Sequence, residues 1–361
     1  MNRPLRILYV INSVEGGGAA SPVPAICDVL RRHGADVRVV ALTRRDGRAL
    51  PAMTDAGIDV VVRDGGVTDH VAALRWLDRQ AAAWRPTHLW TSLTRATLLG
   101  QLVGLRRRLP VVSWQHAAWL RPANLRLLRA TQRLSMLWIG DSAIVTRLTA
   151  ERLGVPPARL MEWPIFRADP AAAQATPWQP GEPVRIGSLG RLHRVKGYDV
   201  LVAALARLDH GGVDFTVEIA GDGGERAALE AAAAAAGVTR LRLSGYAARP
   251  REVLARLHLY VQPSRSEGLC IAAHEAMQAG LPVIASAVGE LPASIVPGAT
   301  GLLVPPGDPA ALAAALAALL AEPARLAAMG AAGRTRVLDR FGPDRFEAAG
   351  AAIMARLRRS G

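Results

Sequence analysis

Two basic side chains stand close to glycines in residues 187–197, GSLGRLHRVKG, which include the end of an apolar run typical of a strand. Arg191 and Lys196 supply positive charge, and Gly190 lets the backbone come close to a ligand. A diphosphate gains negative charge as its bond to a sugar breaks, and preorganised cations stabilise that charge. The segment therefore predicts a site at which a group leaves a diphosphate.

Lys196 is the single lysine of the chain, since 43 of the 44 basic residues are arginine. A chain that uses arginine nearly everywhere and lysine at this position suggests that a compact point charge is needed there. Chance is the alternative, because one lysine has to lie somewhere.

Two carboxylates, Glu267 and Glu275, lie in the otherwise mainly apolar segment 263–286. A helix that begins near Leu269 would leave them about 12 Å apart, too far to share a proton, so they are expected to have different roles. Glu267 is placed to contact a sugar and Glu275 to bind ribose hydroxyls, while the amides at the helix start face a diphosphate. Two surface acids on an amphipathic helix are the alternative, which the apolar neighbours disfavour. The donor-binding residues expected at the helix start are Gly268, Leu269, Cys270 and Ile271.

Three consecutive glycines, Gly16, Gly17 and Gly18, follow the first apolar run. Glycines between a strand and a helix allow the backbone to approach phosphate oxygens, and the start of the helix, expected near Pro24, adds amide donors. A tight connection without a ligand explains the same loop equally well. The loop lacks the Gly-x-Gly-x-x-Gly spacing of a dinucleotide site.

Short apolar runs alternate with amphipathic stretches along the chain, which is the pattern of parallel sheets wound with helices. The Pro-rich residues 176–183 interrupt this pattern and are typical of a linker. Because single cores stop growing at about 250 residues, we predict two doubly wound domains, with a cleft where the carboxyl ends of their strands face each other. The predicted domains are 1–178 and 179–341, followed by a helix over 342–361 that crosses back to the first domain.

Positive charge is concentrated in the first half of the chain. Residues 1–180 contain 24 arginines and 13 acids, whereas the remainder contains 20 basic and 17 acidic residues. Such a surface favours contact with an anionic membrane, and an ordinary solvated surface is the alternative. Nucleic acid is disfavoured because no recognised binding motif is present. All eight tryptophans also lie in this half, and Trp114 and Trp119 are placed to stack on a sugar or to meet a lipid.

Three features predict a cytoplasmic protein. No uninterrupted apolar run approaches the roughly 18 residues of a membrane span. The first run, 7–11, is too short for the apolar core of a signal peptide. Cys27 and Cys270 are the only cysteines and lie far apart, which argues against a disulfide framework or a zinc site.

The order of these motifs resembles the retaining glycosyltransferases of family 4, which have the GT-B fold of two facing Rossmann-like domains. The resemblance covers nearly the whole chain, through ILYVINSVEGGGA, SLGRLHRVKGYDVLVAAL, IAGDGGERAAL, the motif around Glu267 and Glu275, and ATGLLVPPGDPAAL. It implies that Arg191 and Lys196 hold the diphosphate of a nucleoside diphosphate sugar. Glu275 would then hold the ribose, and Glu267 would contact the transferred sugar.

The resemblance also implies that the loop 16–18 closes over the phosphate and that His116 faces the sugar from the first domain. A lone histidine at a strand end is otherwise more often a hydrogen-bonded structural residue. His193 and His274 are interpreted as structural.

The implied reaction is a retaining transfer that uses no metal or other cofactor, and no Asp-x-Asp pair is present to hold a cation. The acceptor is expected to be a glycan, a lipid-linked molecule or a small molecule, in the synthesis of cell-surface polysaccharide or glycoconjugate. Contact with the inner face of the membrane through the basic first domain fits a lipid-linked acceptor. An inverting transferase or an epimerase has no support beyond the shared fold.

Three positions depart from the family pattern: Ala20 stands where Glu or Gln is usual, Cys270 where Gly or Pro is common, and Ala293 where Glu is frequent. The first two lie in the expected sugar and acceptor pockets, so they leave the substrates open. They also motivate the alternative that the chain is a catalytically silent GT-B partner subunit or a glycan-binding protein. The four intact charged positions that argue against this alternative are Arg191, Lys196, Glu267 and Glu275.

Overall fold

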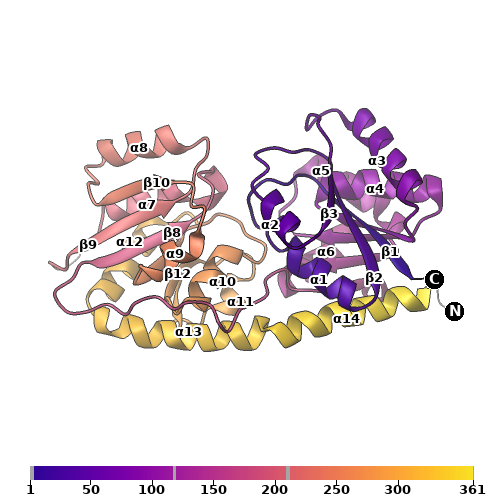
Figure 1. Ribbon diagram of the computed structural model, residues 1–361. Helices are drawn as coiled ribbons and strands as arrows, with labels where there is room; N and C mark the ends of the chain where they lie inside the picture. The colour runs from indigo at the N-terminus through magenta and orange to yellow at the C-terminus, as the bar shows by residue number, and fades with distance from the viewer. Residues whose placement is uncertain (1–3, 117–118, 209–211, 361) are drawn as a thin grey trace. The chain divides into compact units, whose positions relative to one another are not determined.

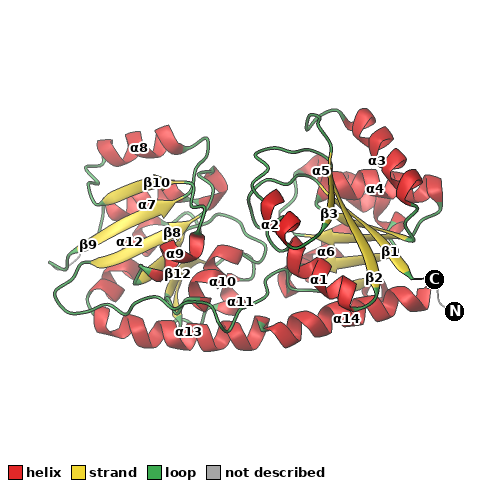
Figure 2. Ribbon diagram, viewed as in Figure 1, coloured by secondary structure: helices red, strands yellow, loops and turns green. Residues whose placement is uncertain are grey.

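The computed structural model describes residues 4–116, 119–208 and 212–360, and the chain in it forms two compact units (Figure 1). The first unit comprises Met1–Arg167 and Pro343–Gly361, and the second comprises Ala168–Gly342. Each unit contains one parallel sheet with helices on both of its faces (Figure 2). The predicted pair of doubly wound parallel-sheet domains is confirmed.

The sheet of the first unit has seven strands in the order β3-β2-β1-β4-β5-β6-β7. All six strands expected from apolar runs are present, and β7 was not expected because its three residues form no apolar run. The strands are β1 (Leu5–Ile11), β2 (Ala35–Ala41), β3 (Asp59–Val62), β4 (His88–Ser92), β5 (Val111–Gln115), β6 (Leu137–Gly140) and β7 (Leu160–Glu162). The helices are α1 (Val23–Arg32), α2 (Leu50–Asp55), α3 (His70–Trp84), α4 (Thr94–Arg107), α5 (Pro122–Thr131), α6 (Ala143–Leu153) and α14 (Pro343–Ser360).

The sheet of the second unit has six strands in the order β10-β9-β8-β11-β12-β13, all of them expected from the sequence. The strands are β8 (Val184–Leu189), β9 (Phe215–Ala220), β10 (Leu241–Gly245), β11 (Leu259–Gln262), β12 (Val283–Ser286) and β13 (Gly301–Val304). The helices are α7 (Tyr198–Leu205), α8 (Arg226–Ala235), α9 (Pro250–Ala255), α10 (Ile271–Gln278), α11 (Leu291–Ser294), α12 (Pro309–Leu320) and α13 (Leu326–Phe341).

Both sheets reverse their winding direction next to their first strand. In the first unit β1 lies between β2 and β4, and in the second unit β8 lies between β9 and β11. The loops that follow two strands on either side of such a point diverge, which leaves room for a ligand at the carboxyl ends of the strands. The loop with the three glycines follows β1, and the loops that contain Lys196 and Glu267 follow β8 and β11.

The units divide at Arg167, earlier than the boundary predicted at residue 178. Residues that follow Arg167 are hydrogen bonded to the second unit: the N–H of Ala175 donates to the carbonyl of Ala279 at 2.7 Å, and the N–H of Thr176 donates to that of Ala255 at 3.1 Å. The Pro-rich composition of 176–183 marked a segment without regular structure, but that segment is part of the second unit.

Helix α14 belongs to the first unit, although its residues follow the whole of the second unit. It lies against α1 (Figure 1), where Glu347 pairs with Arg32 at 2.6 Å. Phe346 of α14 packs on the buried ring of Trp163, with 5.2 Å between the ring centroids. This helix therefore completes the aromatic core of the first unit.

No single helix in the described ranges is long and apolar enough to cross a membrane, and 309–320 with 323–359 meets that test only as a bent pair. Both cysteines, Cys27 and Cys270, are free and buried.

Candidate active site

Lys196 is positioned by the loop between β8 and α7. A short 3-10 turn, Arg194–Lys196, is followed by Gly197, whose φ of 69° lies in the left-handed region that favours glycine. A Cβ at Gly197 would overlap the carbonyl oxygen of Pro263, which follows β11. The loops after the two central strands of this sheet are therefore in direct backbone contact.

Arg265 connects the same two loops. Its N–H donates to the carbonyl of Val195 at 2.8 Å, and its guanidinium donates two hydrogen bonds of 2.6 Å to the carboxylate of Asp199. Bidentate pairs of this kind fix orientation as well as distance. The backbone around Lys196 is thus held on both sides.

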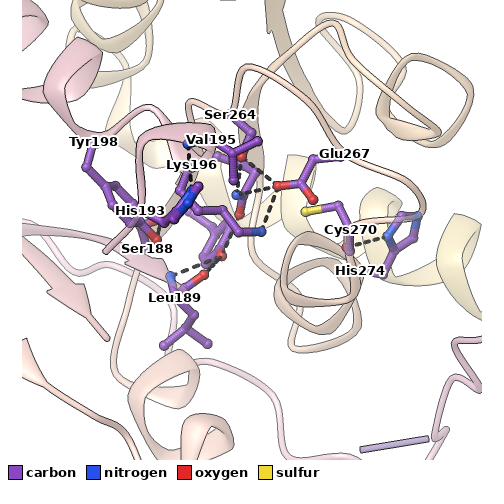
Figure 3. Close-up of polar contacts among 12 residues, drawn as sticks. Ser188, Leu189, His193, Val195, Lys196, Tyr198, Ser264, Glu267, Cys270 and His274 are labelled. Carbon is purple, nitrogen blue, oxygen red and sulfur yellow. Dashed lines mark hydrogen bonds and ion pairs between the residues drawn. The ribbon is translucent and has the colours of Figure 1, made fainter. Parts of the chain in front are cut away.

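Glu267 lies in the loop between β11 and α10, and its Oε1 accepts three hydrogen bonds. Lys196 Nζ donates at 2.8 Å, Ser264 Oγ at 2.6 Å and Gln262 Nε2 at 3.2 Å. Figure 3 shows the side chains of Lys196 and Glu267 pointing toward each other, and they are 22% and 10% exposed. The structure therefore brings together a cation and an acid that the sequence analysis selected separately.

Lys196 remains charged at neutral pH. Burial alone would lower its pKa, but the carboxylate of Glu267 together with the nearby Cys270 and Tyr198 outweighs burial and raises the pKa above the usual range for lysine. Within the described part of the chain, Glu267 is the one hydrogen-bond partner of the ammonium group. Since an ammonium group has three hydrogens, two remain for the oxygens of an anion.

The start of α10 lies beside this ion pair. Cys270, the residue before the helix, has a φ of 67°, and Figure 3 shows its Sγ on the side of Glu267. The Nδ1 of His274 lies 2.9 Å from the carbonyl oxygen of Cys270, and its Nε2 lies 2.7 Å from Ser294 Oγ. Burial lowers the pKa of His274 to about 4, so the neutral ring donates to Cys270 and accepts from Ser294. His274 therefore holds the start of the helix in place.

The backbone amides at this helix start are available to a ligand. Among the described residues, no hydrogen-bond acceptor faces the N–H groups of residues 268–271. The first N–H groups of a helix have no partner within it, and they attract anions together with the helix dipole. Unbonded amides and the free ammonium hydrogens of Lys196 together form a set of donors suited to phosphate oxygens. The predicted residues at this helix start are Gly268, Leu269, Cys270 and Ile271.

Glu275 lies one turn into α10 and is partly buried. Burial raises the pKa of its carboxyl group to about 7, and the positive charge of Arg251 offsets only part of that effect. No hydrogen bond or ion pair to its side chain occurs within the described ranges. A poorly solvated acid without a partner is expected where a ligand completes the environment.

Within the described ranges, the side chain of Arg191 forms no hydrogen bond or ion pair with Lys196, Glu267 or their neighbours, and it is exposed. The preceding residue, Gly190, lies against the ion pair: a Cβ there would be 2.8 Å from the hydroxyl of Tyr198 and 3.6 Å from Cε of Lys196. The backbone of Arg191 therefore starts next to Lys196, while its guanidinium extends into solvent.

The loop Gly16–Gly18 belongs to the first unit and is exposed. The N–H of Gly16 donates to Asp46 Oδ1 at 3.0 Å, and the Oγ of Ser21 donates to the carbonyl of Gly17 at 2.9 Å. Ala20, a departure from the family pattern, is buried. Closure of this loop over a phosphate stays a prediction.

His116 follows β5 and lies between residues from the two neighbouring strand ends. Ser92 Oγ lies 2.7 Å from its Nε2, and Asp141 Oδ2 lies 3.5 Å from its Nδ1. The ring stacks on Trp114 with 5.5 Å between centroids, and the side chain is 7% exposed. Both ring nitrogens thus have polar neighbours within the first unit. Contact of His116 with a sugar stays a prediction.

The neighbours that hold these residues were not predicted from the sequence. Ser92 and Asp141 stand at the ends of the apolar runs on either side of the run that ends at His116, so the sheet order would have aligned them. Ser264 lies three residues before Glu267, a spacing that a tight loop brings into contact. These signals depend on strand neighbours and loop shape, which composition alone does not define.

No group of three or more His, Cys, Asp or Glu side chains in the described ranges is placed to hold a metal ion. The donors around Lys196 are N–H groups, which suit anions. Independence from a metal stays a prediction.

Gly197→Ala is expected to destabilise the second unit by at least about 2 kcal/mol, because the new Cβ would overlap backbone and force the Lys196 loop away from Pro263. Gly237→Ala is the matched control, since its φ is 65° and a Cβ there would meet nothing within 4 Å, so only the left-handed strain of about 1 kcal/mol is expected. Denaturant unfolding of both variants measures the difference. Equal losses would show that the two loops are not in tight contact.

Solved structures with similar folds cover nearly the whole chain. A structure of Anabaena HepE in complex with UDP-glucose aligns with a TM-score of 0.84 and 19% identity over 99% of this chain and 100% of that chain. Sucrose-phosphate synthase from Thermosynechococcus elongatus aligns with a TM-score of 0.78 and 21% identity over 99% and 98%. The chain therefore has the two-domain GT-B fold.

Residues 173–336 match the family model described as glycosyl transferases group 1. A 2-deoxystreptamine glucosyltransferase of Streptomyces kanamyceticus is 40% identical over 167 residues, which are 45% of this chain and 43% of that protein. The D-inositol 3-phosphate glycosyltransferase 1 of Catenulispora acidiphila is 28% identical over 341 residues, 85% of this chain and 77% of that protein. The chain spans 43% of the length of the Streptomyces relative and 41% of the length of another curated relative, a D-inositol 3-phosphate glycosyltransferase of Segniliparus rotundus. These matches and the GT-B fold bear out the predicted resemblance of the chain to GT-B glycosyltransferases, and its assignment to retaining family 4 stays a prediction.

Proposed function

We propose that the protein transfers a sugar from a nucleoside diphosphate sugar to an acceptor, with retention of configuration and without a metal. The observation that carries the proposal is the Lys196–Glu267 ion pair beside the unbonded amides of α10. This arrangement lies at the carboxyl ends of β8 and β11, in the unit that matches the glycosyl transferases group 1 model. Its free donors suit a diphosphate and its acid suits a sugar hydroxyl.

In the proposed reaction, the bond between the anomeric carbon and the diphosphate oxygen breaks, and the diphosphate keeps the electron pair. Lys196 and the amides of α10 stabilise the charge that develops, and Arg191 approaches the same oxygens from solvent. The acceptor oxygen then bonds to the anomeric carbon from the face that the diphosphate leaves. Its proton passes to the departing phosphate oxygen, so no separate base is required.

The two acids have separate roles in the proposal. Glu267 orients the ammonium group of Lys196 and contacts the transferred sugar through its second oxygen. Glu275, one turn further along α10, accepts hydrogen bonds from the ribose hydroxyls. His116 and the loop 16–18 contribute from the first unit.

The acceptor is proposed to be a small polyhydroxylated molecule, a glycan or a lipid-linked molecule. Two relatives are named for 2-deoxystreptamine and D-inositol 3-phosphate, which supports the small-molecule class. A cytoplasmic location and a role in cell-surface polysaccharide or glycoconjugate synthesis are parts of the same proposal.

Thermal shift with UDP, GDP and ADP, followed by assay of donor hydrolysis and transfer, tests the proposal. A nucleotide at a hundred times its Kd adds about 2.7 kcal/mol to stability, which is a shift of several degrees. UDP is the first nucleotide to test, because HepE was solved with it. A shift with no turnover of any sugar donor would instead indicate a catalytically silent partner subunit. No shift with any nucleoside diphosphate would contradict the proposed donor class.

A further inference from the structure

A long stretch of the first unit is entirely free of acidic residues. Residues 79–140 contain ten arginines and no aspartate or glutamate. The stretch includes the helices α4 and α5, which pack against each other. Three of these arginines pair with acids outside the stretch, Arg95 with Asp69 and both Arg106 and Arg107 with Asp78. The others leave a local excess of positive charge, which produces a potential that attracts polyanionic surfaces.

Four of the eight large apolar side chains that are exposed within the described ranges lie on these two helices or just before α5. They are between 46% and 65% exposed, and they include a tryptophan, a residue that favours the boundary between water and lipid. The four side chains are Leu102, Leu105, Trp119 and Leu127.

These side chains border one small core cluster. Leu98 of α4 packs on that cluster, as do Leu120 and Leu125, and the exposed Leu127 directly precedes Leu128 of the cluster. Leu102 lies one helical turn after Leu98, on the same side of α4. Trp119 directly precedes Leu120. The exposed apolar groups therefore continue the edge of a core instead of being scattered over the molecule.

Five exposed arginines lie on the same two helices as these apolar groups or next to the ends of those helices. Within the described ranges none of them takes part in an ion pair or a side-chain hydrogen bond, in contrast to Arg107, which pairs with Asp78 at 2.7 Å. Together with the four apolar side chains they form what we call the basic apolar face. Its arginines are Arg108, Arg121, Arg126, Arg129 and Arg133.

We propose that the basic apolar face binds the surface of an anionic lipid bilayer. Unpaired guanidinium groups are attracted to lipid phosphates, while their apolar stems, Trp119 and the leucines enter the headgroup region. The attraction draws on both the charge and the apolar groups, which distinguishes this face from an ordinary solvated one. The inference is independent of the proposed transfer reaction, because no residue of the Lys196 site contributes to it.

Vesicle sedimentation of the full chain tests the proposal. Vesicles of phosphatidylcholine with phosphatidylglycerol are expected to bind the protein at low salt, and vesicles of phosphatidylcholine alone to bind it far less. Binding is expected to weaken in high salt, because salt screens the charges of exposed arginines. Equal binding to both vesicle types, or none to either, would overturn the proposal.

Two sets of arginine substitutions distinguish the effect of this face on vesicle binding from the effect of the protein's net charge. Replacing Arg126, Arg129 and Arg133 with Gln is expected to lower vesicle binding about a hundredfold, at about fivefold per arginine. The control replaces three exposed arginines of the second unit that pair with acids, Arg242, Arg249 and Arg325, and is expected to keep most of the binding. Unchanged melting temperatures would show that both triple variants are folded.

Trp119→Ser tests the apolar part. It is expected to weaken vesicle binding and to leave the salt dependence unchanged, since it removes no charge. Equal loss in the two triple variants, or tight binding of RNA by a protein that does not bind vesicles, would assign the face to another role and overturn the proposal.

Discussion

Lys196→Ala is expected to lower sugar transfer by about a hundredfold to a thousandfold while leaving the protein folded. Removing one preorganised donor to a developing negative charge has effects of about that size in enzymes. The variant is also expected to bind nucleoside diphosphates more weakly, because the ammonium group supplies two of the free donors at the start of α10. Turnover of the donor and thermal shift with the nucleotide measure the two effects.

Loss of Lys196 also leaves Glu267 without its cation, so a structural effect has to be separated from a catalytic one. The double variant Lys196→Met with Glu267→Gln removes both charges and keeps the side-chain volumes close to the originals. It is expected to be folded and equally inactive. Lys196→Arg is expected to restore little activity, because the Cε of Lys196 lies close to Gly190 and leaves little space for a larger group. Near-normal turnover of any of these variants would contradict the role given to Lys196.

Glu275→Gln is expected to raise the stability of the free protein and to weaken donor binding. The carboxyl group of Glu275 has a pKa of about 7 in the folded protein, above its ordinary value of 4.5. Between those two values the folded protein holds a proton that the unfolded chain has released, so stability falls as the pH rises through this window. The amide has no such dependence, and its gain over the parent is expected to be about 3 kcal/mol at about pH 8 and below about 1 kcal/mol at about pH 5.

Hydrogen exchange of β11 and β12 measures this gain within the second unit alone. Nucleotide titration at the same pH is expected to show affinity reduced by about a hundredfold, since charge-assisted hydrogen bonds to ribose are lost. Glu225→Gln, at an exposed position before α8, is the control and is expected to change neither quantity. If the difference in stability between the Glu275→Gln variant and the parent did not change with pH, the carboxyl group of Glu275 would be shown to be solvated. Unchanged affinity would remove Glu275 from the proposed donor site.

Much of this fold could be predicted from the alternation of apolar runs and amphipathic stretches in the sequence. Twelve strands were expected from apolar runs, because buried parallel strands consist almost wholly of apolar residues. The short strand β7 was not predicted because its three residues, Leu160–Glu162, are too few to form such a run. The boundary at Arg167 escaped because a Pro-rich segment signals irregular backbone, and irregular backbone can still belong to a packed unit.

The candidate site could be predicted from the sequence only in part. Lys196 and Glu267 were identified by charge among apolar residues and glycines, and their meeting required the order β8-β11, which the sequence does not state. Arg191 was grouped with them by position in the motif, yet its side chain reaches into solvent. The partners of His116 depend on which strands are neighbours, so their role became visible only with the sheet assembled.

The arrangement of the chain has a consequence for its synthesis. The first unit is interrupted after Arg167 and is finished only by α14, while the second unit is contiguous from Ala168 to Gly342. A ribosome delivers residues in order, at about 5–20 per second. The second unit can therefore fold before the ring of Phe346 has been synthesised and can pack on the indole of Trp163. The half of the protein that is made first is the half that is completed last.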